Sequence, residues 1–163
     1  GIVDKPALLG HKVLNYQVIG NDNDLSNLAK KYKHALITVG QIKSPSLRIH
    51  LYEIAKAAGF ELPSIISPRA YITKSSNLGE GTIIMHDALI NSNVEIGNNC
   101  IINTRALIEH DSSIGDHCHI STNVIINGGV KVNQGSFIGS GSTVVDGKVI
   151  NHNSFIKARS IIK

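Results

Sequence analysis

The chain has 163 residues, of which 42% are hydrophobic and 17% charged, an ordinary globular composition. No apolar run approaches the ~20 residues needed to cross a bilayer, and no signal peptide is visible, so no membrane partner is expected. The net charge of +4 comes from scattered Lys and Arg, and only 4% of residues are aromatic, which argues against binding of nucleic acid. The charge favours either a mild attraction for anionic small molecules, such as nucleotides or CoA, or simple solubility.

Residues 1–62 alternate short apolar runs with helical patterns. The run VLNYQVIG (13–20) predicts a strand, and NDNDLSNLAKKY (21–32) predicts Asx caps followed by a short helix. HALITVG (34–40) predicts a buried strand, because it is short and rich in β-branched residues. The alternation is typical of a small parallel α/β domain, similar to a Rossmann fold.

The clearest helix is predicted over SPSLRIHLYEIAKAAG (44–59). Ser44 is a suitable N-cap, Pro45 suits the first helical position, and Gly59 suits the position just past the end. The opening GIVDKP resembles the end of a strand, and no glycine-rich phosphate turn precedes it. We therefore expect residues 1–62 to be a partial sugar- or nucleotide-binding domain that lacks its first strand and helix.

A period of six residues governs the chain from residue 66 onward. Ile, Leu or Val occupies every sixth position from Ile66 to Ile162, seventeen times without exception. Four residues after each, a second position is small or Val, except at Lys148. Such a repeat predicts a parallel β-helix, a triangular solenoid with eighteen residues per coil. We predict about five coils over residues 63–163, with the aliphatic residue pointing inward and the small residue turning the corner.

The two cysteines fall on this second position. Cys100 and Cys118 lie eighteen residues apart and are therefore predicted to be stacked corner residues. They lack the CxxC spacing of a zinc site and are too few for a secreted disulfide framework. A reduced, cytoplasmic protein is expected.

Titratable residues gather in one stretch of the repeat, NTRALIEHDSSIGDHCHIS (103–121). His110 lies two residues past the inward Ile108 and should face outward, and either Glu109 or Asp111 could hold one of its ring nitrogens. Gly128, eighteen residues on, should lie one coil above His110, leaving room for a substrate and exposing backbone N–H groups. A base and such donors are what acyl transfer from a thioester requires.

These motifs, together with LPSIISPRAYI (62–72) and the α/β segment, resemble the bacterial sugar acyltransferases of the left-handed β-helix type. The most similar subgroup is the sialic acid O-acetyltransferase and nucleotide-amino-sugar N-acetyltransferase family. The resemblance implies left-handed coiling, acetyl-CoA as co-substrate, and a homotrimer with each active site between two subunits. The acceptor would be a sugar or nucleotide sugar, held by the first domain. Oxygen and nitrogen acetylation both remain open.

The resemblance also implies roles for individual residues. His110 would be the catalytic base and Asp111 its acidic partner. His119 and the amide of Gly128 would lie near the thioester carbonyl, with His119 supplied by a neighbouring subunit. The two substrate-binding candidates are Asn103 in the pocket and Asp4 in the first domain.

Gly139 and Gly141, in FIGSGST, are candidates for close approach of the CoA pantetheine, although ordinary turn chemistry would also place glycine there. The remaining histidines of the repeat, His86, His117 and His152, are expected to be surface residues.

Three alternatives remain. A zinc enzyme of the solenoid carbonic anhydrase type needs paired histidines five residues apart, and no HxxxxH pair is present, so no metal is expected. A non-catalytic scaffold should show one regular outer face, whereas the outward positions here are mixed. An acyltransferase for another small acceptor, such as an amino acid, is the third.

Overall fold

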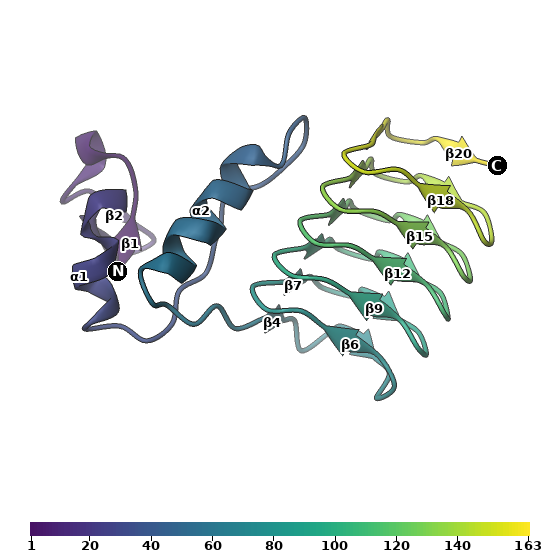
Figure 1. The fold of residues 1–163 in the computed structure, drawn as a ribbon, viewed down its shortest axis with the longest axis horizontal. Helices are drawn as coiled ribbons and strands as arrows, with labels where there is room; N and C mark the ends of the chain where they lie inside the picture. Colours follow the sequence, from purple (N-terminus) through teal and green to yellow (C-terminus); the bar gives the residue numbers. More distant parts are fainter.

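The computed structural model describes residues 1–163 and divides them into two regions (Figure 1). Residues 1–62, the first region, hold short strands and helices. Residues 65–162 form a solenoid whose coils are stacked along one axis. None of the helices is long and apolar enough to cross a membrane.

The first region contains a three-stranded sheet of order β1-β3-β2, in which β1 and β3 are parallel and β2 and β3 antiparallel. Its elements are β1 (Ile2–Val3), the 3-10 helix η1 (Pro6–Leu8), β2 (Lys12–Val13), β3 (Tyr16–Gly20), the 3-10 helix η2 (Asp22–Asp24), α1 (Leu25–Ala29) and α2 (Ser46–Ala57).

The predicted strand at 13–20 is interrupted. Leu14 and Asn15 have φ of 48° and 69°, so they form the tight turn of a β2–β3 hairpin, and only Tyr16–Gly20 is one continuous strand. The predicted caps and short helix after it are confirmed, because Asn21 and Asp24 form a capping box around η2, which leads directly into α1.

The predicted strand at 34–40 is wrong. Only one bridge, between His34 and Glu61, marks this segment. The carbonyls of Ile37 and Val39 accept hydrogen bonds from the guanidinium of Arg48 instead of from a neighbouring strand. A short β-branched run predicts a buried strand from its pattern alone. Here the run lies beside α2 and has no strand to pair with.

The predicted helix at 44–59 is confirmed as α2. The Ser44 hydroxyl accepts from the N–H of Ser46, the first helical residue, which Pro45 directly precedes. Gly59 follows the helix with a φ of 98°, a left-handed conformation that costs glycine little.

The solenoid is a left-handed parallel β-helix with three flat faces, built from two-residue strands (Figure 1). Face 1 contains β4 (Ile65–Ile66), β7 (Ile83–Ile84), β10 (Ile101–Ile102), β13 (His119–Ile120), β16 (Phe137–Ile138) and β19 (Phe155–Ile156). Face 2 contains β5 (Tyr71–Ile72), β8 (Leu89–Ile90), β11 (Leu107–Ile108), β14 (Ile125–Ile126), β17 (Thr143–Val144) and β20 (Ile161–Ile162). Face 3 contains β6 (Asn77–Leu78), β9 (Glu95–Ile96), β12 (Ser113–Ile114), β15 (Lys131–Val132) and β18 (Val149–Ile150).

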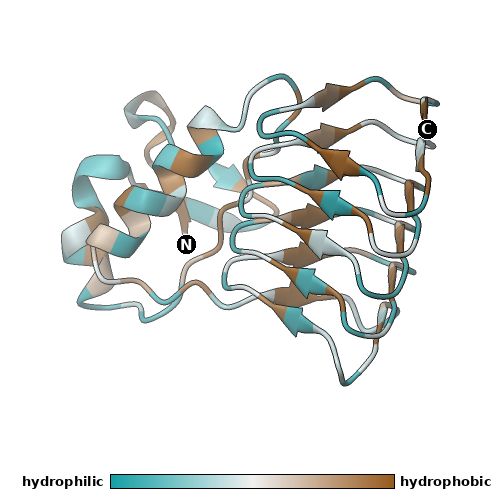
Figure 2. Ribbon diagram, turned by 45° about the vertical axis from the view of Figure 1, so that its right-hand side comes forward, coloured by the Kyte–Doolittle hydropathy of each residue, from teal (hydrophilic) through white to brown (hydrophobic).

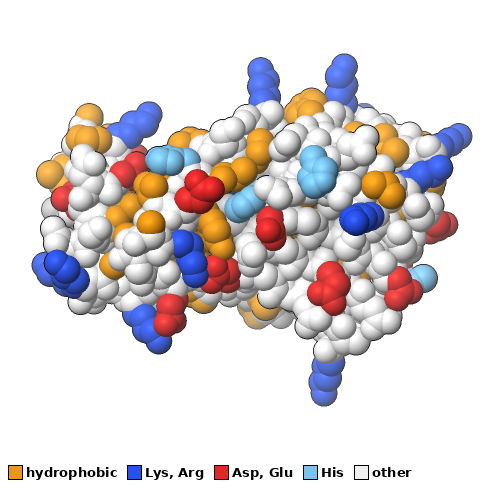
Figure 3. Space-filling model, viewed as in Figure 1, with side chains coloured by type: hydrophobic (Ala, Val, Ile, Leu, Met, Phe, Trp, Pro, Cys, Tyr) orange, Lys and Arg blue, Asp and Glu red, His pale blue; other side chains and the backbone are white.

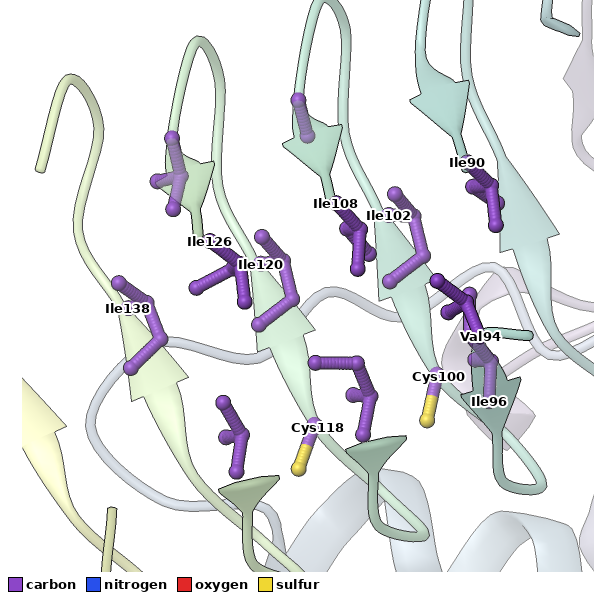
Figure 4. Packing of buried hydrophobic residues seen from close by; sticks show 14 of the residues in the cluster. Ile90, Val94, Ile96, Cys100, Ile102, Ile108, Cys118, Ile120, Ile126 and Ile138 are labelled. Carbon is purple, nitrogen blue, oxygen red and sulfur yellow. The ribbon is translucent and has the colours of Figure 1, made fainter. Parts of the chain in front are cut away.

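The register between coils is eighteen residues, as the repeat predicts. Ile108, for example, pairs with Ile90 below and Ile126 above. The aliphatic residues fill one continuous interior, seen as stacked isoleucines in Figure 4, and many of the strands that carry them are brown in Figure 2. Removing the side chain of such a fully buried Ile costs about 2–5 kcal/mol, because packed neighbours cannot close the cavity.

The corner geometry differs from the prediction in one respect. The small residues from Thr82 to Ser142, including Cys100 and Cys118, point inward and are buried (Figure 4). The turn itself is made by the residue just before each such position from Thr82 onward, which has a positive φ. These turning residues are Gly81, Asp87, Asn93, Asn99, Arg105, Asp111, His117, Asn123, Gly129, Gly135, Gly141, Gly147, Asn153 and Arg159.

Helix α2 joins the two regions by packing against the corner between faces 3 and 1 (Figure 1). Tyr52 donates to Glu80 at 2.6 Å, and Lys56 pairs with the same carboxylate at 2.9 Å. Arg48 is buried and donates to backbone carbonyls of both regions, including that of Asn99. Its guanidinium has no carboxylate partner, and burial lowers its pKa to about 10.

Candidate active site

His110 lies at the corner between faces 2 and 3, on the turn from β11 to β12. Its Nδ1 is 2.8 Å from Oδ2 of Asp111, the next residue in the sequence. Asp111 has a left-handed backbone conformation, with a φ of 59°. The hydrogen bond to Asp111 raises the pKa of His110 and lowers that of Asp111. With Nδ1–H donating to the carboxylate, Nε2 is left to accept a proton.

The structure resolves which acidic neighbour orients His110. Glu109 accepts a hydrogen bond from Asn91 at 2.7 Å and takes no part in the contact with the ring. Asp111 is itself held by Asn93, whose amide donates to Oδ1 at 3.2 Å. Asp111 is therefore the partner of His110.

Gly128 lies directly above His110, as the spacing predicts. A Cβ atom at Gly128 would lie 2.9 Å from Cε1 and 3.0 Å from Nε2 of the ring. The glycine therefore keeps open the side of the ring where a substrate would approach. Its amide is not free, however: the N–H donates to Oδ1 of Asp146, one coil further up, at 3.2 Å.

His119 and Asn103 form a second cluster, on face 1 and its corner with face 2. His119 is buried, with Nδ1 2.5 Å from the Gln41 carbonyl oxygen and Nε2 3.3 Å from the Asn103 amide nitrogen. Its ring also meets Phe137 edge-on, with centroids 5.2 Å apart. Burial lowers the pKa of His119, so the ring is neutral near pH 7.

The structure thus brings the predicted site residues into two groups. One group holds His110, Asp111 and Gly128, and the other holds Asn103 and His119; face 2 of the solenoid separates them. Asp4 belongs to neither group, because it lies in the first region directly after β1, where its carboxylate accepts from the Lys5 N–H at 2.7 Å.

The two glycines expected to approach CoA have local roles in the coil. A Cβ at Gly139 would lie 2.5 Å from the backbone nitrogen of Ala158, so glycine there permits the next coil to stack. Gly141 is a turning residue with a φ of 68°. Their role in CoA binding stays a prediction.

The prediction that His117 is a surface residue is wrong. Helix α2 covers its corner, Asn99 lies 3.0 Å from Nδ1, and Tyr52 meets the ring edge-on at 5.5 Å. The period of six placed His117 on an outward corner but carried no information on what packs over that corner.

Four residues near the site were missed. Asn93 and Asp146 lie eighteen residues from Asp111 and Gly128, so the register of the repeat was sufficient to find them. Gln41 and Arg48 come from the first region, and no sequence signal links them to the solenoid.

No group of three or more His, Cys, Asp and Glu side chains is arranged to hold a metal ion. On the face shown in Figure 3, Lys and Arg side chains are scattered rather than gathered in a patch.

Comparison with known proteins agrees with this architecture. The family model described as bacterial transferase hexapeptide (six repeats) matches residues 75–110. No curated protein sequence matches the chain. The acetyltransferase domain of PglB from Neisseria gonorrhoeae FA1090 is similar in structure, with a TM-score of 0.89, 25% identity, and coverage of 99% of this chain and 77% of that one.

Two ligand complexes are also similar. The same PglB domain in complex with acetyl coenzyme A has a TM-score of 0.84 at 25% identity, covering 93% of this chain and 74% of that one. A point variant of GDP-perosamine N-acetyltransferase from Caulobacter crescentus, in complex with CoA and GDP-perosamine, has a TM-score of 0.71 at 28% identity, covering 93% and 76%. The solenoid and these matches identify the chain as an acetyltransferase built on a left-handed β-helix, similar to the hexapeptide-repeat enzymes.

Proposed function

We propose that the chain transfers the acetyl group of acetyl-CoA to the amino group of a nucleotide-linked sugar, with His110 as general base. The observation that carries the proposal is the His110–Asp111 pair beneath Gly128, an oriented imidazole with an unobstructed Nε2. The nitrogen acceptor and the two ligands are supported by the similar proteins, one of which is a GDP-perosamine N-acetyltransferase with CoA bound.

The residues present suffice for direct transfer. The amine attacks the thioester carbonyl carbon while His110 Nε2 takes the proton that the nitrogen loses. Asp111 stabilises the resulting imidazolium through Nδ1–H. The tetrahedral intermediate then collapses, the C–S bond breaks, and His110 returns its proton to the departing CoA sulfur. A positioned base of this kind contributes typically ~10²–10⁴-fold to the rate.

The outer surface of face 2 supports assembly into a homotrimer. Its outward residues are mostly apolar: Tyr71, Leu89, Leu107, Ile125, Thr143 and Ile161. The outward residues of face 3 are mostly polar: Asn77, Glu95, Ser113, Lys131 and Val149. An apolar strip along the whole solenoid is typical of an interaction surface.

A threefold arrangement would also join the two groups of site residues. If face 2 of each subunit turns toward the axis, its corner with face 3 lies beside the face 1–face 2 corner of the next subunit. The first of these corners carries His110, and the second carries Asn103 with His119 next to it. Each active site would then contain His110 of one subunit and His119 of another, as predicted.

The first region, residues 1–62, is proposed to hold the acceptor. Asp4 follows β1 at the same sheet edge at which the parallel strand β3 ends. Ligands of parallel sheets bind at this carboxyl edge. A carboxylate there suits the hydroxyls of a sugar or ribose. Gly139 and Gly141, on the solenoid, are proposed to lie along the path of CoA.

Release of the CoA thiol, followed with a thiol reagent, tests the proposal. The protein is incubated with acetyl-CoA and, separately, a panel of nucleotide-linked amino sugars and a panel of sialic acids. Rapid release with an amino sugar and its N-acetylated product by mass spectrometry are expected. Release with sialic acids alone would replace nitrogen by oxygen as the acceptor atom, and release with neither would refute sugar acetylation.

A further inference from the structure

His119 is held in a single tautomer by residues 37–43 of the first region, the connection that leads into α2. The carbonyl oxygen of Gln41, 2.5 Å from Nδ1, can only accept a hydrogen bond, so Nδ1 carries the proton. Nε2 is then an acceptor, and the amide of Asn103 donates to it at 3.3 Å. The position of the Gln41 carbonyl therefore fixes the His119 ring, and the ring in turn fixes the side-chain amide of Asn103.

Asn103 is fixed on both sides of its amide by these contacts. Its Oδ1 accepts from the N–H of Thr104 at 2.7 Å, and one N–H of Nδ2 is directed at His119. The second N–H of Nδ2 has no partner and is available to a substrate oxygen. If the His119 ring carried its proton on Nε2 instead, two donors would face each other and the amide would have to turn.

The side chain of Gln41 fastens the connection to the solenoid. Gln41 is buried, and its Nε2 donates to the carbonyl of His117 at 2.8 Å. Its Oε1 has no hydrogen-bond partner. A buried acceptor without a partner is unfavourable, so this amide stabilises the structure only through its donor.

Arg48 fixes the preceding part of the same connection. Nη1 donates to the carbonyls of Ile37 and Val39, at 2.7 and 2.8 Å, while Nε donates to Asn99 on the solenoid at 3.2 Å. The backbone is therefore anchored two residues before Gln41, and the Gln41 side chain sets the last step to His119.

We propose that Gln41 is a positioning residue of the active site: its bond to His117 places its own carbonyl on His119, which in turn orients the Asn103 amide. This inference rests on the proposed function, because that function gives Asn103 and His119 their place beside the thioester. Gln41 itself touches neither substrate.

The test replaces the amide without emptying the site. Gln41→Met keeps the length of the side chain and removes the N–H, and Gln41→Glu keeps its shape and is made in parallel. Gln134→Met is the matched control, because Gln134 is exposed and its side chain makes no hydrogen bond. The tautomer of His119 is read from long-range ¹H–¹⁵N NMR spectra of histidine-labelled protein, and kcat and KM are measured with acetyl-CoA and the best acceptor.

In the unaltered protein, we expect His119 to carry its proton on Nδ1 alone. Both Gln41 variants should show a mixture with the Nε2–H form and a fall in kcat of about tenfold or more, with KM for acetyl-CoA unchanged. The control should match the unaltered protein. An unchanged His119 tautomer in both variants would overturn the proposal, and so would an altered tautomer with unchanged kcat.

The proposed function and the role of Gln41 can be refuted separately. If the tautomer changes as expected but even the unaltered protein transfers no acetyl group to any sugar, the link from Gln41 to His119 stands and the proposed function falls. If the unaltered protein is active and the tautomer does not respond, the proposed function stands and the role of Gln41 falls.

Discussion

Gly128 stands one coil above His110, and a Cβ atom there would lie 2.9 Å from Cε1 of the imidazole. Gly128→Ala should therefore push the ring off its position while the solenoid stays folded, because the exposed ring can turn away. We expect the free energy of unfolding to change by less than about 1 kcal/mol and kcat to fall at least about tenfold. Denaturant unfolding and the thiol-release assay measure the two effects.

Gly129→Ala is the matched control at the next residue. Gly129 has a φ of 65°, and a Cβ there would meet its nearest neighbour only at 4.0 Å. Gly129→Ala should therefore lower the free energy of unfolding by about 1–2 kcal/mol through backbone strain. The activity per folded molecule should be retained. Equal loss of activity in both variants would contradict the steric role of Gly128.

Asp111→Asn should move the pH dependence of the reaction. The Asp111 carboxylate raises the pKa of His110. As the pH is lowered, His110 is therefore protonated, and inactive as a base, at a higher pH than a histidine without this partner. In the variant, the pKa of His110 falls, so the acidic limb of the pH–rate profile should shift to lower pH, while the maximal rate falls about tenfold or more.

Glu109→Gln provides the comparison for that shift. Glu109 acts on His110 only through its charge and is bonded to Asn91, so its removal should shift the limb much less. If the two variants shift the limb equally, Asp111 is not the specific partner of His110.

Arg48→Ala should weaken the contact between the two regions and destabilise the protein. It would remove a buried side chain and leave the carbonyls of Ile37, Val39 and Asn99 without their donor, at a total cost of more than about 3 kcal/mol in the free energy of unfolding. Arg69→Ala is the control, since Arg69 makes an exposed pair with Asp87 and should cost at most about 1 kcal/mol. Urea unfolding distinguishes the two; equal costs would show that burial of Arg48 is unimportant.

Leu89→Glu, on the outer surface of face 2, should prevent association of subunits. Leu89 is 39% exposed in the single chain, so the charge does not disturb the interior but would be buried in a trimer. Light scattering should show a folded monomer, and activity should be lost with the shared site. Val149→Glu, 59% exposed on face 3, should leave mass and activity unchanged. A trimeric Leu89→Glu protein would place the interface elsewhere.

The solenoid was predictable because its period of six is a direct consequence of its geometry. Two residues in six, the aliphatic one and the small one, point inward, and eighteen residues return the chain to the same place. The stacking of Gly128 over His110 therefore follows from counting. The pairing of His110 with Asp111 rather than Glu109 needed the structure, since it depends on how the left-handed turn directs the two carboxylates.

The first region was less predictable for a physical reason. Its contacts with the solenoid, such as those of Arg48 and Gln41, join residues far apart in sequence that no repeat relates. The same contacts cover His117, and they explain why a corner position that should be exposed is buried. Likewise, Ala35 and Ile37 in the run at 34–40 pack against the small core of the first region, although the run has no strand partner.

The most direct test of the account is the activity of His110→Ala with acetyl-CoA and the best amino-sugar acceptor, at the pH optimum of the unaltered protein. His110 is exposed and outside the solenoid core, so circular dichroism and the oligomeric mass should be unchanged. We predict a fall in kcat of roughly 10²-fold or more, as for the loss of a general base. A folded His110→Ala protein with nearly unaltered turnover would contradict the assignment.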